Sequence, residues 1–450
     1  MSSRARKAII VAMLFSFCSA AGAERSDNLP RVLRYLPDDP NYAGQTCHAL
    51  VLEAPNGIPS SVANLGLIEP ELCQAVDRDV APETTRLALI TAERLLAEEV
   101  SIPPADVLPQ DELGERIQPP VEFTSAAIDE SRRLIIVAGL NYAEHRDEVG
   151  AVNSASAADL LLIPKATPPT SAYRPVPTGV VIGSEPPRPV LLLDYEVEIA
   201  LVLLDGIDLR APPTRSELLS NTALVAANDV SDRGPIIQDD THGYTRGKSQ
   251  PGYFPLGPWL VPAWHLDVAA GGEGGQSLAV ELTVSKRTSN GSQLSTTRQS
   301  DHSTSMLHGP EHMIAELSRR YLAGGQLCMP DAWGRPRLLH DGEGRIPAGS
   351  ILLTGTPGGT AVRPPNLFDK ARLFFEGGLS VSGARAELIE EQERDAQLLG
   401  YLRPGDVVET WVEKLGRQLW SVIPPDDEGA GDVYGITGSG SCDDFERGEG

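Results

Sequence analysis

The feature that most constrains the fold is a series of short apolar runs separated by turns and a few helices. The runs cover residues 134–138, 190–204, 223–230, 278–284, 350–353 and 407–412. Most have the length of a β-strand, whereas only residues 84–100 and 310–322 show a clear helical pattern. The 43 glycines and 37 prolines favour many tight turns. The pattern predicts a strand-dominated α+β fold and argues against a regular βαβ alternation.

The chain length indicates more than one structural unit. A chain of 450 residues is longer than a single compact core usually needs. We expect a small N-terminal domain and linker at 24–125, in which 101–120, rich in Pro, Asp and Glu, forms the linker. A larger domain should follow at 126–423. Residues 424–450 are acidic and poor in apolar side chains, so we predict a disordered tail.

The N-terminus has the pattern of a secretory signal peptide at residues 1–23. Basic residues at 4, 6 and 7 precede an apolar run from Ala8 to Ala20, which is too short to span a bilayer. Ala21-Gly22-Ala23 is a small-residue cleavage site. A lipoprotein signal ending at Cys18 is the alternative, but Phe17 is bulky for that processing. The sequence therefore predicts export to the periplasm or the extracellular space, with no membrane segment after cleavage.

The number of cysteines indicates possible disulfides, and the net charge bears on the class of binding partner. After signal removal four cysteines remain, Cys47, Cys73, Cys328 and Cys442, for which three pairings are possible in an oxidising compartment. We favour Cys47 with Cys73, because both lie in the N-terminal segment; buried free thiols are the alternative. The net charge of −24 makes nucleic acid an unfavourable partner.

Two acidic segments contain candidate ligands for a cation. On a strand, Asp194, Glu196 and Glu198 share one face, and two carboxylates at i and i+2 can converge on a hard cation. Asp229 follows the apolar run 223–227 and could supply a third oxygen. The alternatives are a strand face in water and an ordinary loop-capping aspartate.

The segment after the first apolar strand contains a candidate general base. His145 and Glu148 are three residues apart, so one helical turn brings them together. A carboxylate beside an imidazole orients the ring and raises its basicity, which suits a base acting on water. An ordinary exposed helical pair is the alternative.

Two loops contain further candidate site residues. Lys248 lies in a Gly/Pro-framed apolar loop and could stabilise developing negative charge; a surface lysine is the alternative. The glycine-rich turn at 353–359 offers backbone N–H groups to a carboxylate, or is a tight turn without a ligand. It lacks the Gly-Lys-Ser/Thr ending of a phosphate loop.

The order of these motifs resembles the catalytic domain of the fumarylacetoacetate hydrolase family over about residues 130–423. The motifs are G-L-N-Y-A-E-H-x-x-E, P-K-A-T, D-Y-E-V-E, N-D-V-S-D-R, G-K-S, P-L-G-P-W, T-G-T-P-G-G and P-G-D-V-V-E. The resemblance implies a mixed β-sandwich or roll with a smaller N-terminal domain. It also implies a homodimer.

The resemblance assigns roles to individual residues. Glu196, Glu198 and Asp229 would hold Mg²⁺, or Mn²⁺ or Ca²⁺, and His145, Glu148 and Lys248 would be catalytic. The substrate-binding residues it implies are Asn141, Tyr142, Lys165, Arg233, Thr354, Gly355 and Thr356. The loop after Arg233 departs from the family pattern, and residues 366–399 look like an inserted element.

The implied activity is hydrolysis of a carbon–carbon bond in a 2,4-dioxo acid of the fumarylacetoacetate or acylpyruvate type. A 2-oxo acid can chelate a metal through its carboxylate and oxo oxygens. The second hypothesis is a decarboxylase, hydratase or isomerase of 2-oxo acids, which would use the same enolate. The third hypothesis is a non-catalytic binding protein that retains the metal. The His-x-x-Glu pair argues against this hypothesis.

Overall fold

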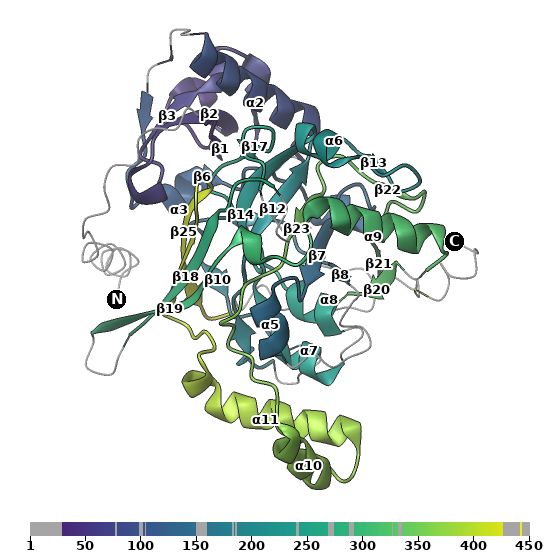
Figure 1. Cartoon of the computed structure of the whole chain (residues 1–450). Coiled ribbons are helices and arrows are strands. Elements are labelled where there is room, and N and C mark those ends of the chain that lie inside the picture. Colours follow the sequence, from purple (N-terminus) through teal and green to yellow (C-terminus); the bar gives the residue numbers. More distant parts are fainter. Residues whose placement is uncertain are drawn as a thin grey trace.

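The computed structural model describes residues 29–425 and Cys442, apart from gaps at 77–78, 99–101, 104, 150–159, 182–183, 185–186, 240–242, 269–273, 288–291, 326 and 332–334. The predicted signal peptide and nearly all of the predicted tail lie outside the described residues. The fold is α+β and rich in strands, as the sequence predicts (Figure 1). Among the described residues, no helix is long and apolar enough to cross a membrane.

The N-terminal region forms a six-stranded sheet in the order β5-β3-β2-β1-β6, with β4 paired to β2. Its strands are β1 (Val32–Tyr35), β2 (Gln45–Glu53), β3 (Ser61–Asn64), β4 (Cys73–Ala75), β5 (Ala105–Val107) and β6 (Ile117–Gln118). The predicted helix is α2 (Pro82–Ala97), and α3 (Leu113–Arg116) precedes β6. Leu33 and Val62 share a hydrophobic core with the larger part of the chain, and Val32 and Leu260 exchange backbone hydrogen bonds.

The linker predicted at 101–120 is wrong in part, because this segment contributes strands β5 and β6. Both are edge strands of the N-terminal sheet. Edge strands tolerate charged residues and prolines that would be unfavourable inside a sheet. The Pro- and acid-rich composition therefore does not distinguish an edge strand from a linker.

The larger part contains an eight-stranded sheet in the order β8-β7-β23-β12-β14-β16-β9, with β17 paired to β14. These strands are β7 (Ile135–Gly139), β8 (Leu161–Pro164), β9 (Thr170–Ser171), β12 (Val197–Leu203), β14 (Thr222–Asn228), β16 (Pro255–Leu256), β17 (Val261–Pro262) and β23 (Ile351–Leu353). Every residue of β12 and β14 is buried, which explains their nearly continuous apolar sequences.

The apolar run at 190–204, predicted as one strand, is split into β11 (Leu193–Asp194) and β12. Between them, the backbone N–H of Glu196 donates to the side chain of Asn228 (3.2 Å) instead of to a neighbouring strand. β11 pairs with β15 (Ser231–Asp232). The interruption lies at the first of the predicted metal ligands.

A five-stranded sheet and several helices complete the fold. The sheet has the order β10-β25-β24-β18-β19, from β10 (Val176–Pro177), β18 (Ala279–Arg287), β19 (Gln293–His302), β24 (Val407–Val412) and β25 (Gly416–Ile423). The helices are α4 (Ser125–Asp129), α5 (Ala143–Glu148), α6 (Arg215–Ser220), α7 (Arg233–Gln238), α8 (Gly243–Lys248) and α9 (Pro310–Leu322). Two short ribbons pair β13 (Ile207–Asp208) with β22 (Arg345–Ile346) and β20 (Cys328–Pro330) with β21 (Pro336–Leu338).

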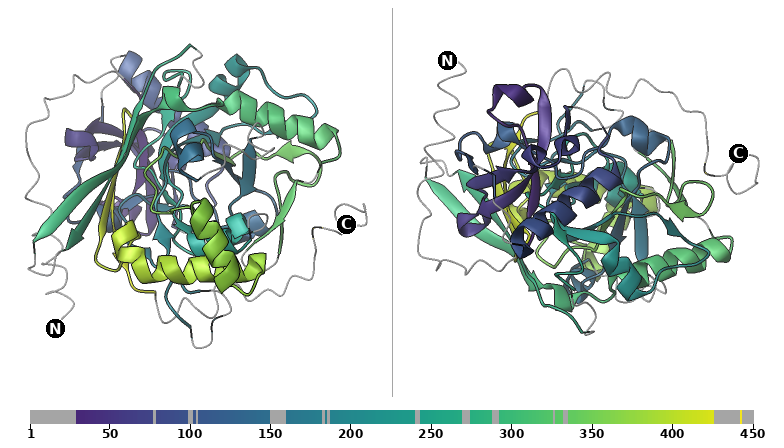
Figure 2. Two further views of the ribbon diagram at one scale, coloured as in Figure 1. Left: turned by 60° about the horizontal axis from the view of Figure 1, so that its bottom comes forward. Right: turned by 90° about the horizontal axis from the view of Figure 1, so that it is seen from above.

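The segment 366–399 forms a helical hairpin of α10 (Leu367–Glu376) and α11 (Val381–Leu399). It lies at the end of the molecule opposite the N-terminal sheet, at the bottom of Figure 1 and in front in the left view of Figure 2. Asn366 caps α10 by accepting from the backbone N–H groups of Phe368 and Asp369. α11 packs against α7.

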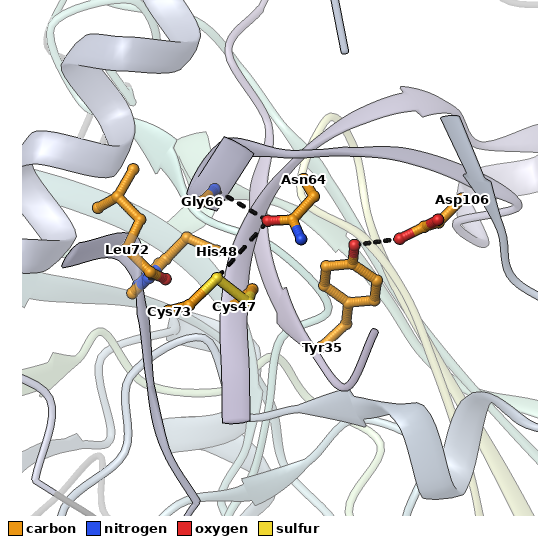
Figure 3. Close-up of a disulfide and its surroundings, with 8 residues drawn as sticks. All are labelled: Tyr35, Cys47, His48, Asn64, Gly66, Leu72, Cys73 and Asp106. Carbon is orange, nitrogen blue, oxygen red and sulfur yellow. Dashed lines mark hydrogen bonds between the residues drawn. A yellow bond between two sulfur atoms is a disulfide. The ribbon is translucent and has the colours of Figure 1, made fainter. Parts of the chain in front are cut away.

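Two disulfides join the remaining four cysteines. Cys47–Cys73 links β2 to β4, which confirms the predicted pair (Figure 3). Cys328–Cys442 connects β20 to the C-terminal segment, 114 residues later.

Candidate functional site

Three carboxylates converge where β12 and β14 meet. The antiparallel pairing of these strands places Glu198 opposite Ala227, and the backbone N–H of Asp229 donates to the carbonyl of Glu196 (2.8 Å). As a result, ligand oxygens of Glu196, Glu198 and Asp229 all lie within 4.8 Å of one another. The three residues are only 4 %, 1 % and 0 % exposed, so they do not form a strand face in water.

Buried cations surround the three carboxylates. The Lys248 ammonium donates to Glu196 (2.5 Å), Asp229 (2.6 Å) and Ser231 Oγ (3.0 Å). Arg233 donates to Glu196 (2.6 Å) and to Asp194 (2.8 Å). Lys248 is therefore a buried member of this cluster and not a surface lysine.

The protonation of the carboxylates differs because their neighbours differ. Burial and the negative charges of Asp229 and Glu196 raise the pKa of Glu198 well above its usual value. Burial would also raise the pKa of Glu196, but the charges of Lys248 and Arg233 outweigh burial and lower it. Burial opposes the charged form of Lys248, yet Asp229 and Glu196 together raise its pKa.

Lys165 lies behind Asp229. Its ammonium donates to Asp229 Oδ1 (2.7 Å) and to the carbonyls of Lys248 (2.5 Å) and Val230 (3.4 Å). These three acceptors match its three N–H donors. Lys165 therefore orients Asp229 in this structure, whereas the sequence predicts a substrate contact.

The predicted general base is assembled at α5. His145 Nδ1 lies 3.4 Å from Glu148 Oε2, and His145 is buried. His145 also interacts electrostatically with Glu196, so the imidazole lies near the carboxylates. Burial would raise the pKa of Glu148, but its bonds to His145 and to the backbone of Gly359 lower it.

The glycine-rich turn follows β23 and closes over Glu198. The Gly355 N–H donates to Glu198 Oε2 (2.7 Å), and Thr354 Oγ1 donates to the carbonyl of Ile199 (2.8 Å). Gly355 has φ +93°, and a Cβ there would lie 2.8 Å from the Ala138 carbonyl, so this position requires glycine. Thr356 Oγ1 accepts from Gln299. The turn thus contacts a predicted ligand directly.

Asn141 and Tyr142 hold the entry to α5. Asn141 bonds to the backbone of His308 through both side-chain atoms and donates to the carbonyl of Thr354 (2.7 Å). Tyr142 is fully buried, and burial raises the pKa of its hydroxyl, as do Asp301 and Glu198. Both residues have structural contacts here, and their predicted substrate contacts remain predictions.

Sequence reasoning missed two residues that organise the site, Asp194 and Gln299. Asp194 binds Arg233 and accepts from the backbone N–H groups of Ala361 (2.9 Å) and Val362 (3.3 Å). Gln299 on β19 joins the backbone of Val197 to Thr356. Asp194 shares the alternation of Glu196 and Glu198, which was a usable signal. Gln299 lies in a polar strand with no distinguishing pattern.

The donor set suits a hard divalent cation. Three buried carboxylates supply oxygen ligands, which Mg²⁺, Mn²⁺ and Ca²⁺ all accept. A cation would also offset the repulsion that raises the pKa of Glu198. Glu196, Glu198 and Asp229 are the residues that would hold it.

One family model matches most of the chain. The family model described as "Fumarylacetoacetate (FAA) hydrolase C-terminal" matches residues 134–422. A search of curated proteins found no match. A solved fumarylacetoacetate hydrolase from Exiguobacterium antarcticum shares 19 % identity at TM-score 0.49, covering 88 % of this chain and 99 % of that one.

Two solved isomerases are also similar. One is a 2-hydroxyhepta-2,4-diene-1,7-dioate isomerase from Mycobacterium marinum, with 15 % identity, TM-score 0.43 and coverage of 88 % of this chain and 98 % of that one. The other is a 5-carboxymethyl-2-hydroxymuconate delta-isomerase from Mycobacterium smegmatis, with 15 % identity, TM-score 0.44 and coverage of 88 % and 99 %.

Proposed function

This chain belongs to the fumarylacetoacetate hydrolase family, and on that premise we propose that it is an exported, divalent-metal-dependent hydrolase of a 2,4-dioxo acid. The substrate class is an acylpyruvate or fumarylacetoacetate-like acid. The observation that carries the proposal is the convergence of three buried carboxylates with Lys248 and the His145–Glu148 pair. A binding protein would not need a buried base beside its metal ligands.

The chain's own residues supply the proton transfers. Glu148 orients the His145 imidazole, which takes a proton from water. The resulting hydroxide attacks the second carbonyl of the dioxo acid, and the bond between that carbonyl carbon and the methylene carbon breaks. The electron pair of that bond forms an enolate, which the Lys248 ammonium stabilises. Protonation of the enolate carbon yields a carboxylic acid and a 2-oxo acid.

The metal would be Mg²⁺, with Mn²⁺ and Ca²⁺ as alternatives that use the same oxygen ligands. When bound, it acts as a Lewis acid and a template for the oxo acid. Lys248 binds two of the carboxylates that would hold the metal, so its ammonium would be available to negative charge that develops on a bound oxo acid. Lys248 and Arg233 lower the pKa of Glu196 and so keep this carboxylate ionised.

Export is supported by two independent features. Residues 1–23 have the composition of a signal peptide, and all four remaining cysteines form disulfides. We place the mature enzyme in the periplasm or outside the cell. A homodimer is the assembly that we propose from family membership.

The test uses the mature chain stripped of metal and assayed with acylpyruvates, fumarylacetoacetate and oxaloacetate. Loss of the enol absorbance should require Mg²⁺ or Mn²⁺. His145→Ala should lower kcat by about 10²- to 10⁴-fold, as expected for loss of a general base. Glu196→Ala should abolish metal-dependent turnover, whereas His302→Ala, at an exposed histidine, should leave it unchanged.

The products separate the candidate reactions. A carboxylic acid with a 2-oxo acid identifies hydrolysis, and carbon dioxide from oxaloacetate identifies decarboxylation. Metal binding through Glu196 without turnover of any of these substrates would count against the hydrolase.

A further inference from the structure

The carboxylate of Glu148 is held by a loop distant in sequence. Glu148 Oε2 accepts from the Gly359 N–H (3.1 Å) and from Thr360 Oγ1 (3.2 Å). Glu148 Oε1 accepts from the Arg363 guanidinium (2.9 Å). His145 is therefore only one of four groups that fix this carboxylate.

Arg363 is itself fixed from two sides. Its NH1 also donates to the carbonyls of Thr360 (2.6 Å) and Val362 (2.8 Å). Its own carbonyl accepts from Nε2 of Gln392 (2.8 Å), a buried residue of α11. Gln392 in turn accepts from the hydroxyl of buried Tyr401 (2.5 Å). Arg363 thus connects α11 to Glu148, through its backbone carbonyl on one side and its guanidinium on the other.

We propose that Arg363, held by Gln392 of α11, is a positioning residue for the His145–Glu148 pair. The α10–α11 hairpin would then support the general base through this arginine, besides forming part of the surface. The proposal rests on the proposed function, because the pair that Arg363 positions is the general base of that function. Arg363 touches neither the three metal-ligand candidates nor Lys248 in the hydrogen bonds of the described residues.

The exposure of Arg363 makes this role separable from stability. Its side chain is 46 % exposed, and ion pairs that open to water contribute little to folding. Removing it should therefore change the geometry and charge around Glu148 while the fold remains intact. The charged and titratable groups that face Glu148 are His145 on its own helix and Arg363 and Tyr195 from packed segments.

The experiment compares Arg363→Ala with Arg372→Ala as a matched control. Arg372 is an exposed arginine of α10 that pairs with Glu376 and Glu391 of the same hairpin. In the metal-loaded enzyme, R363A should lower kcat roughly 10-fold, the scale typical of residues that orient catalytic groups. The acidic limb of its pH–rate profile should move to higher pH. R363K should recover part of kcat, Q392A should give a smaller loss, and R372A should match the wild type.

Hydrogen–deuterium exchange of residues 143–149 gives a readout independent of turnover. Exchange should rise in R363A and stay unchanged in R372A, with equal thermal unfolding midpoints. Wild-type kcat, pH profile and exchange in R363A would overturn the positioning role. If the wild type turns over none of the oxo acids but exchange still rises in R363A alone, the proposed function fails and the positioning role stands.

Discussion

Glu198 is the residue whose environment is least favourable without a cation. It is buried beside two other carboxylates, and its only described hydrogen-bond donor is the Gly355 N–H. Lys248 and Arg233 compensate Glu196, but neither forms a hydrogen bond to Glu198. The ionised form of Glu198 therefore costs free energy that a bound cation can offset.

Glu198→Gln should therefore separate metal binding from folding. The amide oxygen can still accept from Gly355, so the metal-free variant should be at least as stable as the wild type. Mg²⁺ or Mn²⁺ at about a hundredfold excess over Kd should stabilise the wild type by about 2.7 kcal/mol and the variant by less. Thermal unfolding with and without metal measures this. Glu376→Gln, at an exposed carboxylate of α10, is the control and should respond to metal like the wild type.

The environment of His48 predicts that the folding stability of the protein falls in acid. It lies beside the Cys47–Cys73 disulfide, and its Nδ1 is 3.2 Å from the Leu72 carbonyl (Figure 3). Burial, and next the charge of Arg34, lower its pKa from 6.5 to about 3. A lowered folded-state pKa means that the unfolded chain binds the proton more readily. The stability that neutral His48 contributes is therefore complete above about pH 6.5 and is lost as pH falls toward 3.

The pH dependence can be tested by substitution. Between about pH 6.5 and pH 4.5 the loss should be on the order of 2–3 kcal/mol, from about two pKa units at 1.36 kcal/mol each. His48→Gln should flatten the curve of unfolding free energy against pH in this window. His302→Gln, at an exposed histidine, should leave it unchanged. Equal slopes for H48Q and wild type would contradict the assignment.

At the scale of elements, helix α10 has two different faces. Leu373 is 2 % exposed and packs inward, whereas Phe368 and Phe375 are 86 % and 73 % exposed. The exposed pair is seven residues apart and therefore shares one side of the helix. The stability of the hairpin thus depends on few buried side chains, and large apolar side chains remain exposed to water.

Substitutions on the two faces should differ strongly in their effect on stability. Leu373→Ala should destabilise the hairpin by about 2–5 kcal/mol, because it leaves a cavity at a buried position. Phe368→Ala should change stability by about 0.5 kcal/mol or less, since it removes few contacts. Hydrogen exchange of residues 367–399 measures both effects. Comparable protection in the two variants would show that the faces are misassigned.

The elements with strong local patterns could be predicted from the sequence. The helix at 310–322 and the strand at 407–412 have the predicted bounds. The shared face of Glu196 and Glu198 and the His145–Glu148 pair also follow from local spacing, whereas the approach of Asp229 depends on the pairing of β12 with β14. Arg363 could not be found in this way, because its contact with Glu148 spans 215 residues and depends on the packing of the hairpin. Edge strands β5 and β6 were missed because their composition is that of a linker.

At the scale of the whole molecule, the disulfides make stability depend on whether the surroundings are oxidising or reducing. The Cys47–Cys73 bridge closes a sequence separation of 26 residues within the N-terminal sheet. By the loop-entropy model, its removal should cost about 3.5 kcal/mol. A Cys47→Ala/Cys73→Ala variant should therefore unfold at lower temperature than the wild type in non-reducing buffer. Equal midpoints in reductant would confirm that the bridge accounts for the difference in non-reducing buffer.

The Cys328–Cys442 bridge also determines what a single backbone break does to the molecule. The covalent ring it closes includes the glycine-rich turn, the α10–α11 hairpin and strands β24 and β25. A protease that cuts once at the exposed tip of the hairpin, between residues 377 and 380, would leave two fragments joined through sulfur. Such nicked protein would migrate as one band on a non-reducing gel and as two after reduction. In an environment rich in proteases, the chain could thus survive a first cut as a single covalent unit.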